Sequence, residues 1–280
     1  DYAEAYNNMG IALQGVVFKQ PNPGLQKTIT LLLDKKTFVR PSDIARAVIS
    51  LLKFEPELKR HLQSSSVNEV EWNLPAVIKD LTELPLLLKL MSVCPLPELD
   101  LENLFRSLRA SLLLSIADLT GSPEELAMQS SLALHCFTNG YIYNQNEKED
   151  EALTALEGAV KLSLNKGDQP SPQSILCLVS YRPVNKYEWS SSLRITNEIE
   201  DVFTRQVTEP NQEAKLKAVV PVLSDITDEV SSMVRDQYEV SPYPRWINLG
   251  LTLKPAAISE VVKKTKLKLF DEAIKGVEAP

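Results

Sequence analysis

The chain contains 280 residues, of which 42 are leucine and only 9 are glycine. Glycine therefore makes up about 3% of the chain, against an average near 7% in soluble proteins. Glycine permits positive-φ turns and the close backbone approach that phosphate-binding loops need, whereas leucine favours helices. This composition predicts an all-α fold and argues against a nucleotide-binding domain within these residues.

Acidic residues outnumber basic ones by 37 to 30, which gives a formal net charge of −7. Nucleic-acid binding depends on clustered Lys and Arg, so we expect no nucleic-acid partner. The one basic block, residues 263–268, is expected to be a solvated helix face, with a nucleic-acid or membrane patch as the alternative. No apolar run reaches the roughly 18 residues that cross a bilayer, so we expect no membrane partner. Three scattered cysteines predict buried thiols in a reducing compartment, hence a cytoplasmic protein: Cys94, Cys136 and Cys177.

The first third of the chain shows helical spacing of apolar residues in several segments. Residues 15–24 contain two glycines and two prolines and are expected to form a loop. Pro41 and Asp43 fit the first turn of a helix whose apolar stripe begins at Ile44. The expected helices cover residues 1–14, 25–34, 41–52, 55–63, 68–83 and 84–93.

The strongest helical stripe runs from Leu101 to Leu119, and Gly121 is expected to end that helix. Immediately afterwards Ser122 and Glu125 have the spacing of a capping box, in which each side chain satisfies a backbone N–H of the other residue. Pro123 suits the first helical position. This pattern predicts a helix over residues 123–137, and a further amphipathic stripe predicts one over 148–164.

The second half of the chain is less regular. Residues 163–174 are expected to form a surface loop, and residues 175–180 fit either a short helix or a buried strand. Prolines are expected to keep residues 239–246 out of helical conformation. Further helices are expected over residues 191–207, 212–226, 228–238 and 257–269, and no strand ladder is evident.

Several common catalytic and metal sites have no sequence counterpart here. The chain lacks both Gly-rich phosphate loops, a C-x-x-C pair and an H-E-x-x-H motif. His61 and His135 are the only histidines, so a catalytic triad has little support. The adjacent pair His135 and Cys136 is expected to pack in the core, with a ligand site as the alternative. We therefore predict no catalytic residue and no metal site.

A helical pattern opens the chain, in which Tyr6, Met9, Gly10 and Leu13 have bulky–x–x–bulky–Gly–x–x–bulky spacing. Gly10 would admit a partner helix closely while the bulky side chains fill the interior of the repeat. The segment resembles the first helix of a tetratricopeptide repeat, and the alternative is a chance amphipathic helix. Repeat units bury their faces on neighbours, so the resemblance implies that earlier repeats precede this chain.

A second motif, QYEVSPYPRW, occupies residues 237–246. Prolines lower the entropy lost on ordering, and Tyr and Trp offer flat faces with a polar tip. Arginine can stack on a ring or hold a carboxylate with two hydrogen bonds. Such a segment suits the docking of one domain on another or the lining of a site. The candidate residues are Gln237, Tyr238, Glu239, Tyr243, Arg245 and Trp246.

This decamer resembles the Q-Y-E-x-[NS]-P-Y-P-R-W motif of bacterial proteins that join tetratricopeptide repeats to a class I S-adenosylmethionine-dependent methyltransferase domain. Residues 133–141 also resemble a Q-C-F-x-N-E-Y segment of that family, with Gly140 in place of the glutamate. The resemblance implies three parts: a repeat remnant at 1–20, a helical domain at 21–226, and a linker at 227–280. It also implies that S-adenosylmethionine binds beyond residue 280 and that no cofactor binds within this chain.

The resemblance implies that these residues form a helical substrate-side or docking region, inactive without the methyltransferase domain. Its partners in cis would be that domain and the upstream repeats. The alternative is a non-enzymatic, tetratricopeptide-type scaffold that binds a protein or peptide. A weaker possibility is a glycosyl- or sulfo-transferase downstream, since tetratricopeptide arrays also precede those enzymes.

Overall fold

The computed structural model describes the chain except for residues 1, 36–38, 66–72, 221–226, 241–255 and 265–280. Within that description the regular structure is helical and contains no strand, so the predicted all-α fold is confirmed. None of the helices in this part of the chain is both long and apolar enough to cross a lipid bilayer.

The helices of the first third follow the predicted order closely. Most of them have a proline in their first turn, where the missing N–H leaves no helical bond unmade. Asn22 and Asn73 add side-chain caps by accepting from the N–H groups of Leu25 and Ala76. The bounds are α1 Tyr2–Leu13, α2 Pro23–Asp34, α3 Pro41–Leu52, α4 Pro56–Ser65, α5 Leu74–Thr82 and α6 Pro85–Val93.

The long stripe predicted as one helix ends early. Helix α7 covers Leu99–Leu114, and a 3₁₀ turn at Ile116–Asp118 follows it. Apolar spacing does not distinguish an unbroken α-helix from a helix that continues as a 3₁₀ turn. The prediction that Gly121 ends this helix is wrong: with φ +73 it precedes Ser122, the N-cap of α8.

Helix α8 covers Pro123–Thr138, and its predicted capping box is confirmed: Ser122 accepts from the N–H of Glu125, whose carboxylate accepts from the N–H of Ser122. A second capping box, formed by Asn146 and Glu149, starts α9 at Glu147–Asn165. Helix α10 covers Pro172–Val179, so the ambiguous segment is helical and the preceding loop is shorter than predicted.

The two helices predicted over 191–207 and 212–226 are wrong in their bounds. Short 3₁₀ turns occupy Val184–Lys186 and Glu188–Ser192, and helix α11 begins only at Asn197. From there α11 (Asn197–Phe203), a π-helical turn (Thr204–Thr208) and α12 (Glu209–Lys217) follow without a break. Pro210 lacks the N–H that would bond four residues back. The wider π turn, in which the N–H of Glu209 reaches the carbonyl of Thr204, accommodates it.

Helix α13 covers Glu229–Val240 and α14 covers Ile258–Lys264. Glu239, expected to lie outside a helix, is therefore in α13. The restriction that Pro242 imposes falls on Ser241, so the helix can continue to Val240.

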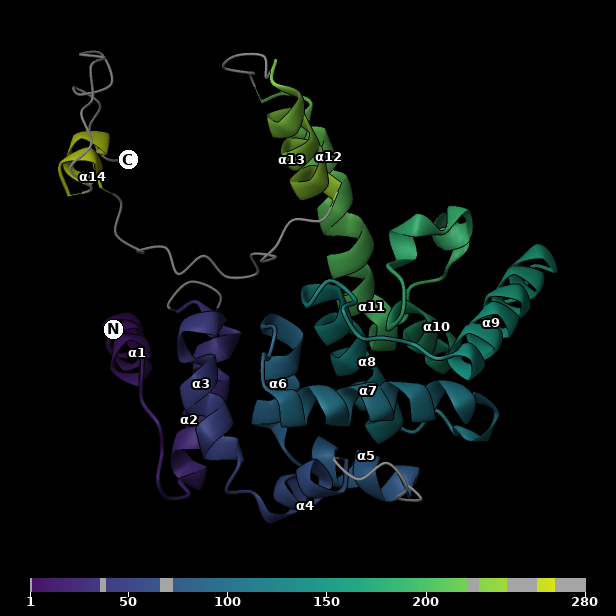
Figure 1. Ribbon diagram of the computed structural model, residues 1–280, viewed down its shortest axis with the longest axis horizontal. Coiled ribbons are helices and arrows are strands. Elements are labelled where there is room, and N and C mark those ends of the chain that lie inside the picture. The colour runs from purple at the N-terminus through teal and green to yellow at the C-terminus, as the bar shows by residue number, and fades with distance from the viewer. Residues whose placement is uncertain (1, 36–38, 66–72, 221–226, 241–255, 265–280) are drawn as a thin grey trace.

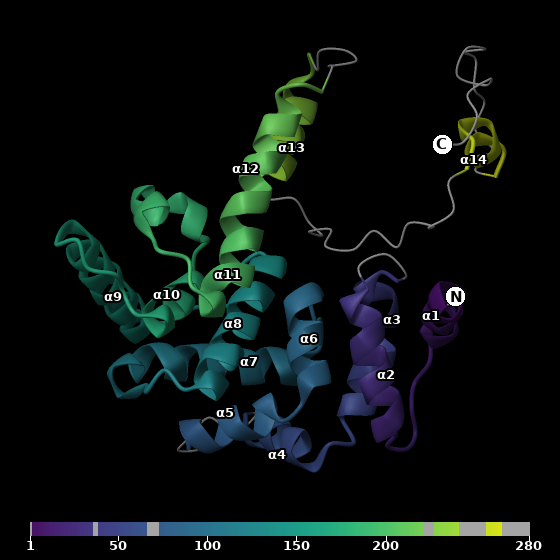
Figure 2. The same ribbon diagram turned by 180° about the vertical axis from the view of Figure 1, so that it is seen from behind.

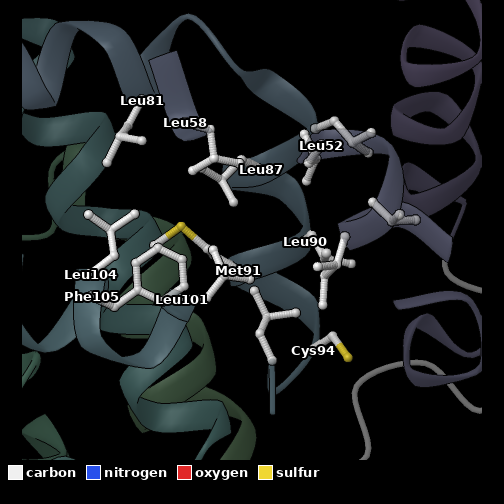
Figure 3. Close-up of a cluster of buried hydrophobic side chains, with 14 of the residues drawn as sticks. Leu52, Leu58, Leu81, Leu87, Leu90, Met91, Cys94, Leu101, Leu104 and Phe105 are labelled. Atoms are coloured by element: carbon white, nitrogen blue, oxygen red, sulfur yellow. The ribbon is translucent and has the colours of Figure 1, made fainter. Parts of the chain in front are cut away.

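Helices α2 to α11 form the body of the molecule, while α12 and α13 extend from it side by side (Figures 1 and 2). One buried apolar cluster joins α2 to α8, and a second joins α7 to α11. Figure 3 shows part of the first cluster, in which leucines from α3 to α7 surround Met91 and Phe105. Met91 and Phe105 are fully buried.

Candidate functional site

A groove of about 670 Å³ lies beside helix α3. One wall is a face of α3, where Ala45 and Ile49 form an apolar floor. The other wall is the segment Cys94–Glu98, which follows α6 and contains Pro95 and Pro97. Val17, from the turn after α1, completes the lining. The volume lies within the roughly 300–1,000 Å³ of typical small-molecule sites.

The polar groups of this groove are unevenly distributed. Lys53, the residue that ends α3, forms an ion pair with Glu98 and so joins the two walls at one end. At the other end, Arg46 is exposed and has no ion-pair partner among the described residues.

Cys94 contributes the only thiol of the groove lining. Burial, with a smaller contribution from the nearby Asp43 carboxylate, raises the pKa of the Cys94 thiol to about 12. The thiol is therefore protonated at neutral pH and is a poor nucleophile. No histidine occurs among the lining residues that the structure describes.

A buried polar cluster lies deeper in the body, centred on Arg109 of α7. The guanidinium is 2% exposed and lies 3.5 Å from a carboxylate oxygen of Glu149. Its Nη2 donates to the carbonyls of Tyr143 (3.3 Å) and Asn144 (2.9 Å), and it stacks 4.0 Å from the ring centre of Tyr181. The Tyr181 hydroxyl donates to Glu149 at 2.7 Å. These contacts join α7, α9 and the segment that follows α10 through one charge pair.

His135 extends this cluster along α8. Its Nε2 lies 2.7 Å from the Tyr143 hydroxyl, and its ring packs edge-on against Phe105. Burial lowers the pKa of His135 to about 4, although the nearby carbonyls of Met91 and Cys94 oppose that shift. The imidazole is therefore neutral at pH 7 and shares a hydrogen bond with the Tyr143 hydroxyl through its Nε2. His135 and the neighbouring Cys136 are both buried, as the packing interpretation predicts.

The end of α8 carries the second resembling segment, residues 133–141. Gly140 has φ +73, a conformation in which a side chain is strained, so the turn favours glycine over an acid there. Tyr141 also has a left-handed φ of +59. Its N–H donates to the carbonyl of Cys136 (2.8 Å) and to Asn139 (3.0 Å), which holds this conformation.

One group of potential metal ligands occurs between α4 and α5. Ligand atoms of Glu57, His61 and Asp80 lie within 4.8 Å of one another. Arg60 forms ion pairs with both carboxylates, and His61 Nε2 lies 2.9 Å from Asp80. The Arg60 guanidinium therefore already neutralises the two carboxylates to which a metal ion would bind.

The repeat-packing candidates lie on one face of α1. Leu13 is 5% exposed and Gly10 is buried, whereas Tyr6 and Met9 are partly buried against the body. This face is directed toward α3, the helix with which α1 makes its main contact.

The candidates of the decamer are only partly described. Gln237, Tyr238 and Glu239 are exposed on α13, and Glu239 forms a 2.7 Å ion pair with Lys217 of α12. Tyr243, Arg245 and Trp246 lie outside the described residues. The described members of the motif are not placed in the groove or in the buried polar cluster.

Sequence reasoning missed both the groove and the Arg109 cluster. One signal for the cluster was available: Arg109 follows Leu108 within a stripe of buried residues, where a charge needs a partner. No comparable local signal marks the groove, because its walls come from three separate segments.

Comparison with known proteins finds no matching family model, no matching curated protein and no matching solved structure.

Proposed function

We propose that this chain is the helical docking or substrate-side region of an S-adenosylmethionine-dependent methyltransferase. The observation that carries the proposal is the decamer at residues 237–246, which resembles the motif that precedes such a domain. The cofactor would bind in the domain after residue 280, and repeats would precede α1. The complete protein would be cytoplasmic.

The surface beside the motif supports this proposal. Helices α12 and α13 lie side by side and are joined by the Lys217–Glu239 ion pair (Figures 1 and 2). These two helices and the turn that follows α12, together the α12–α13 hairpin, expose apolar side chains that would gain stability on burial, by about 25 cal/mol for each Å² covered. These side chains are Leu216, Val219, Val220, Val230, Met233, Val234 and Tyr238.

The motif then has a docking role in the proposal. Tyr238 would pack on the catalytic domain together with the apolar hairpin, while Tyr243 and Trp246 add flat aromatic faces. Arg245 would hold a carboxylate of that domain. The hairpin and the motif would thus form one continuous contact.

The test uses the complete gene product. We expect isothermal titration calorimetry to detect S-adenosylmethionine binding. An Arg245→Ala/Trp246→Ala variant should bind S-adenosylmethionine, or catalyse methyl transfer, at least tenfold less well. Arg106→Ala, an exposed change on α7, is the matched control and should behave as the wild type. Unchanged binding and turnover in the motif variant would refute its docking role.

A non-enzymatic scaffold is the second candidate, favoured by the outer face of α1. Ile11 is 58% exposed there, which suits the stacking of a further helix. Under this alternative the complete gene product would bind no S-adenosylmethionine. A gene product without a methyltransferase domain would likewise contradict the first proposal.

A further inference from the structure

The groove beside α3 lies on a different part of the molecule from α12 and α13, so its role is independent of the proposed function (Figure 1). Cys94 lies at the edge of the apolar cluster, and its sulfur points away from the labelled leucines (Figure 3). The groove thus borders the core, and its floor is apolar where Ala45 and Ile49 meet Cys94. A bound molecule would remove apolar surface from water there, which is favourable.

The walls of the groove restrict the shape of an occupant. The Lys53–Glu98 ion pair joins α3 to the opposite wall, so a long chain cannot pass straight through that end. Pro95 and Pro97 have no N–H to offer, so this wall recognises shape and apolar surface more than backbone hydrogen bonds. These features suit one molecule of limited length.

The charges restrict its polarity. Glu98 neutralises Lys53, whereas Arg46 has no ion-pair partner in the described part of the chain. Asp43 places negative potential near Cys94. Among the described groove residues, Arg46 is therefore the cation that can pair with an anionic group, and the apolar floor of Ala45 and Ile49 can contact the rest of the molecule.

We propose that this groove binds a small monocarboxylate with an apolar body, whose carboxylate pairs with Arg46 and whose apolar part lies on Ala45 and Ile49. Ser42, on the exposed turn of α3 beside Arg46, lines the same end and can donate a hydrogen bond to the second carboxylate oxygen.

The test measures binding of dansyl-labelled undecanoate to the chain by fluorescence, with displacement by unlabelled decanoate. We expect a Kd in the micromolar range, below about 1 mM. Decanol, which lacks the charge, should compete at least tenfold less well. Absence of decanoate binding up to about 1 mM, or equal competition by decanol, would overturn the proposal.

Two variants separate charge from shape. Arg46→Glu, an exposed change, should weaken decanoate binding at least tenfold, whereas Arg106→Glu on α7 is the matched control and should not. Ala45→Phe should fill the floor and reduce binding of both decanoate and decanol. Circular dichroism melts verify that each variant folds. If Ala45→Phe does not fold, the result for Arg46→Glu decides the test.

A peptide is the competing occupant. An acetylated tetrapeptide with adjacent Leu and Asp residues and an amidated C-terminus carries the same two features, an apolar group and a carboxylate, on a peptide backbone. If this peptide binds in an Arg46-dependent manner and decanoate does not, the ligand class proposed here is wrong.

Discussion

The body of the molecule and its α12–α13 hairpin are built from the same kinds of residue but bury them very differently. In the body, leucines such as Leu90 are completely buried, whereas Leu216 on α12 is 63% exposed and Met233 on α13 is 67% exposed. The body therefore supplies its own packing partners, whereas the hairpin leaves apolar side chains exposed. Helicity alone therefore does not indicate where the stabilising contacts are.

The largest expected effect tests the polar centre of the body. Replacing Arg109 by Met leaves Glu149 charged and buried, which should cost about 3–5 kcal/mol in the free energy of unfolding. Urea denaturation measures this loss. Arg109→Met combined with Glu149→Gln should recover much of it, since no lone charge then remains and the amide oxygen can still accept from the N–H of Asn146. A double variant as unstable as Arg109→Met would show that the two side chains stabilise the fold by more than the neutralisation of each other's charge.

A matched pair of leucine truncations tests the comparison directly. Leu90→Ala should cost about 2–5 kcal/mol, because it leaves a cavity in the core. Leu216→Ala should change stability by no more than about 0.5 kcal/mol, because the side chain is exposed. Thermal melts of both variants measure the difference. Equal losses would mean that the hairpin is packed in solution and that the contrast with the body is wrong.

The third effect is a dependence on pH that arises from His135. Its pKa is about 4 in the folded chain and about 6.5 when unfolded. The unfolded state therefore binds the proton first as pH falls, and stability is lost between about pH 6.5 and pH 4. This group should contribute about 3 kcal/mol of that loss. The stability of His135→Gln, measured by urea unfolding at both limits, should fall correspondingly less than that of the wild type.

The smallest effect concerns a helix cap in the body. Ser122→Ala removes one half of the capping box that starts α8 and should cost about 1 kcal/mol. Ser231→Ala is the control on the hairpin, because Ser231 is exposed and receives a cap from Asp228 instead of supplying one. Its thermal midpoint should stay close to that of the wild type, whereas that of Ser122→Ala should fall by a few degrees.

Helix starts were the part of the fold best predicted from the sequence. Prolines and capping side chains act within one turn, so Pro41 and the Ser122–Glu125 pair could be read locally. The end of α7 and the π turn before Pro210 were missed, because they depend on backbone hydrogen bonds that apolar spacing does not encode.

The candidate sites were harder to predict for a related reason. Arg109, Glu149 and Tyr181 meet across 72 residues of sequence, and no local pattern specifies which distant groups a buried arginine will reach. The groove likewise needs α3, the turn after α1 and the segment after α6 to come together. The decamer, by contrast, is a local pattern, so the sequence could reveal it without indicating its surroundings.

Through the π turn before Pro210, α11 and α12 continue as one helical segment. Its 21 residues, 197–217, span about 30 Å at the rise of an α-helix. The pivot is Gln206, fully buried, which accepts from the N–H of Val184 and donates to the carbonyl of Val179. A rotation of about 10° at that pivot would move the end of α12, which is 11 residues or roughly 16 Å away, by roughly 3 Å. A small repacking around one buried amide could thus re-aim the whole hairpin.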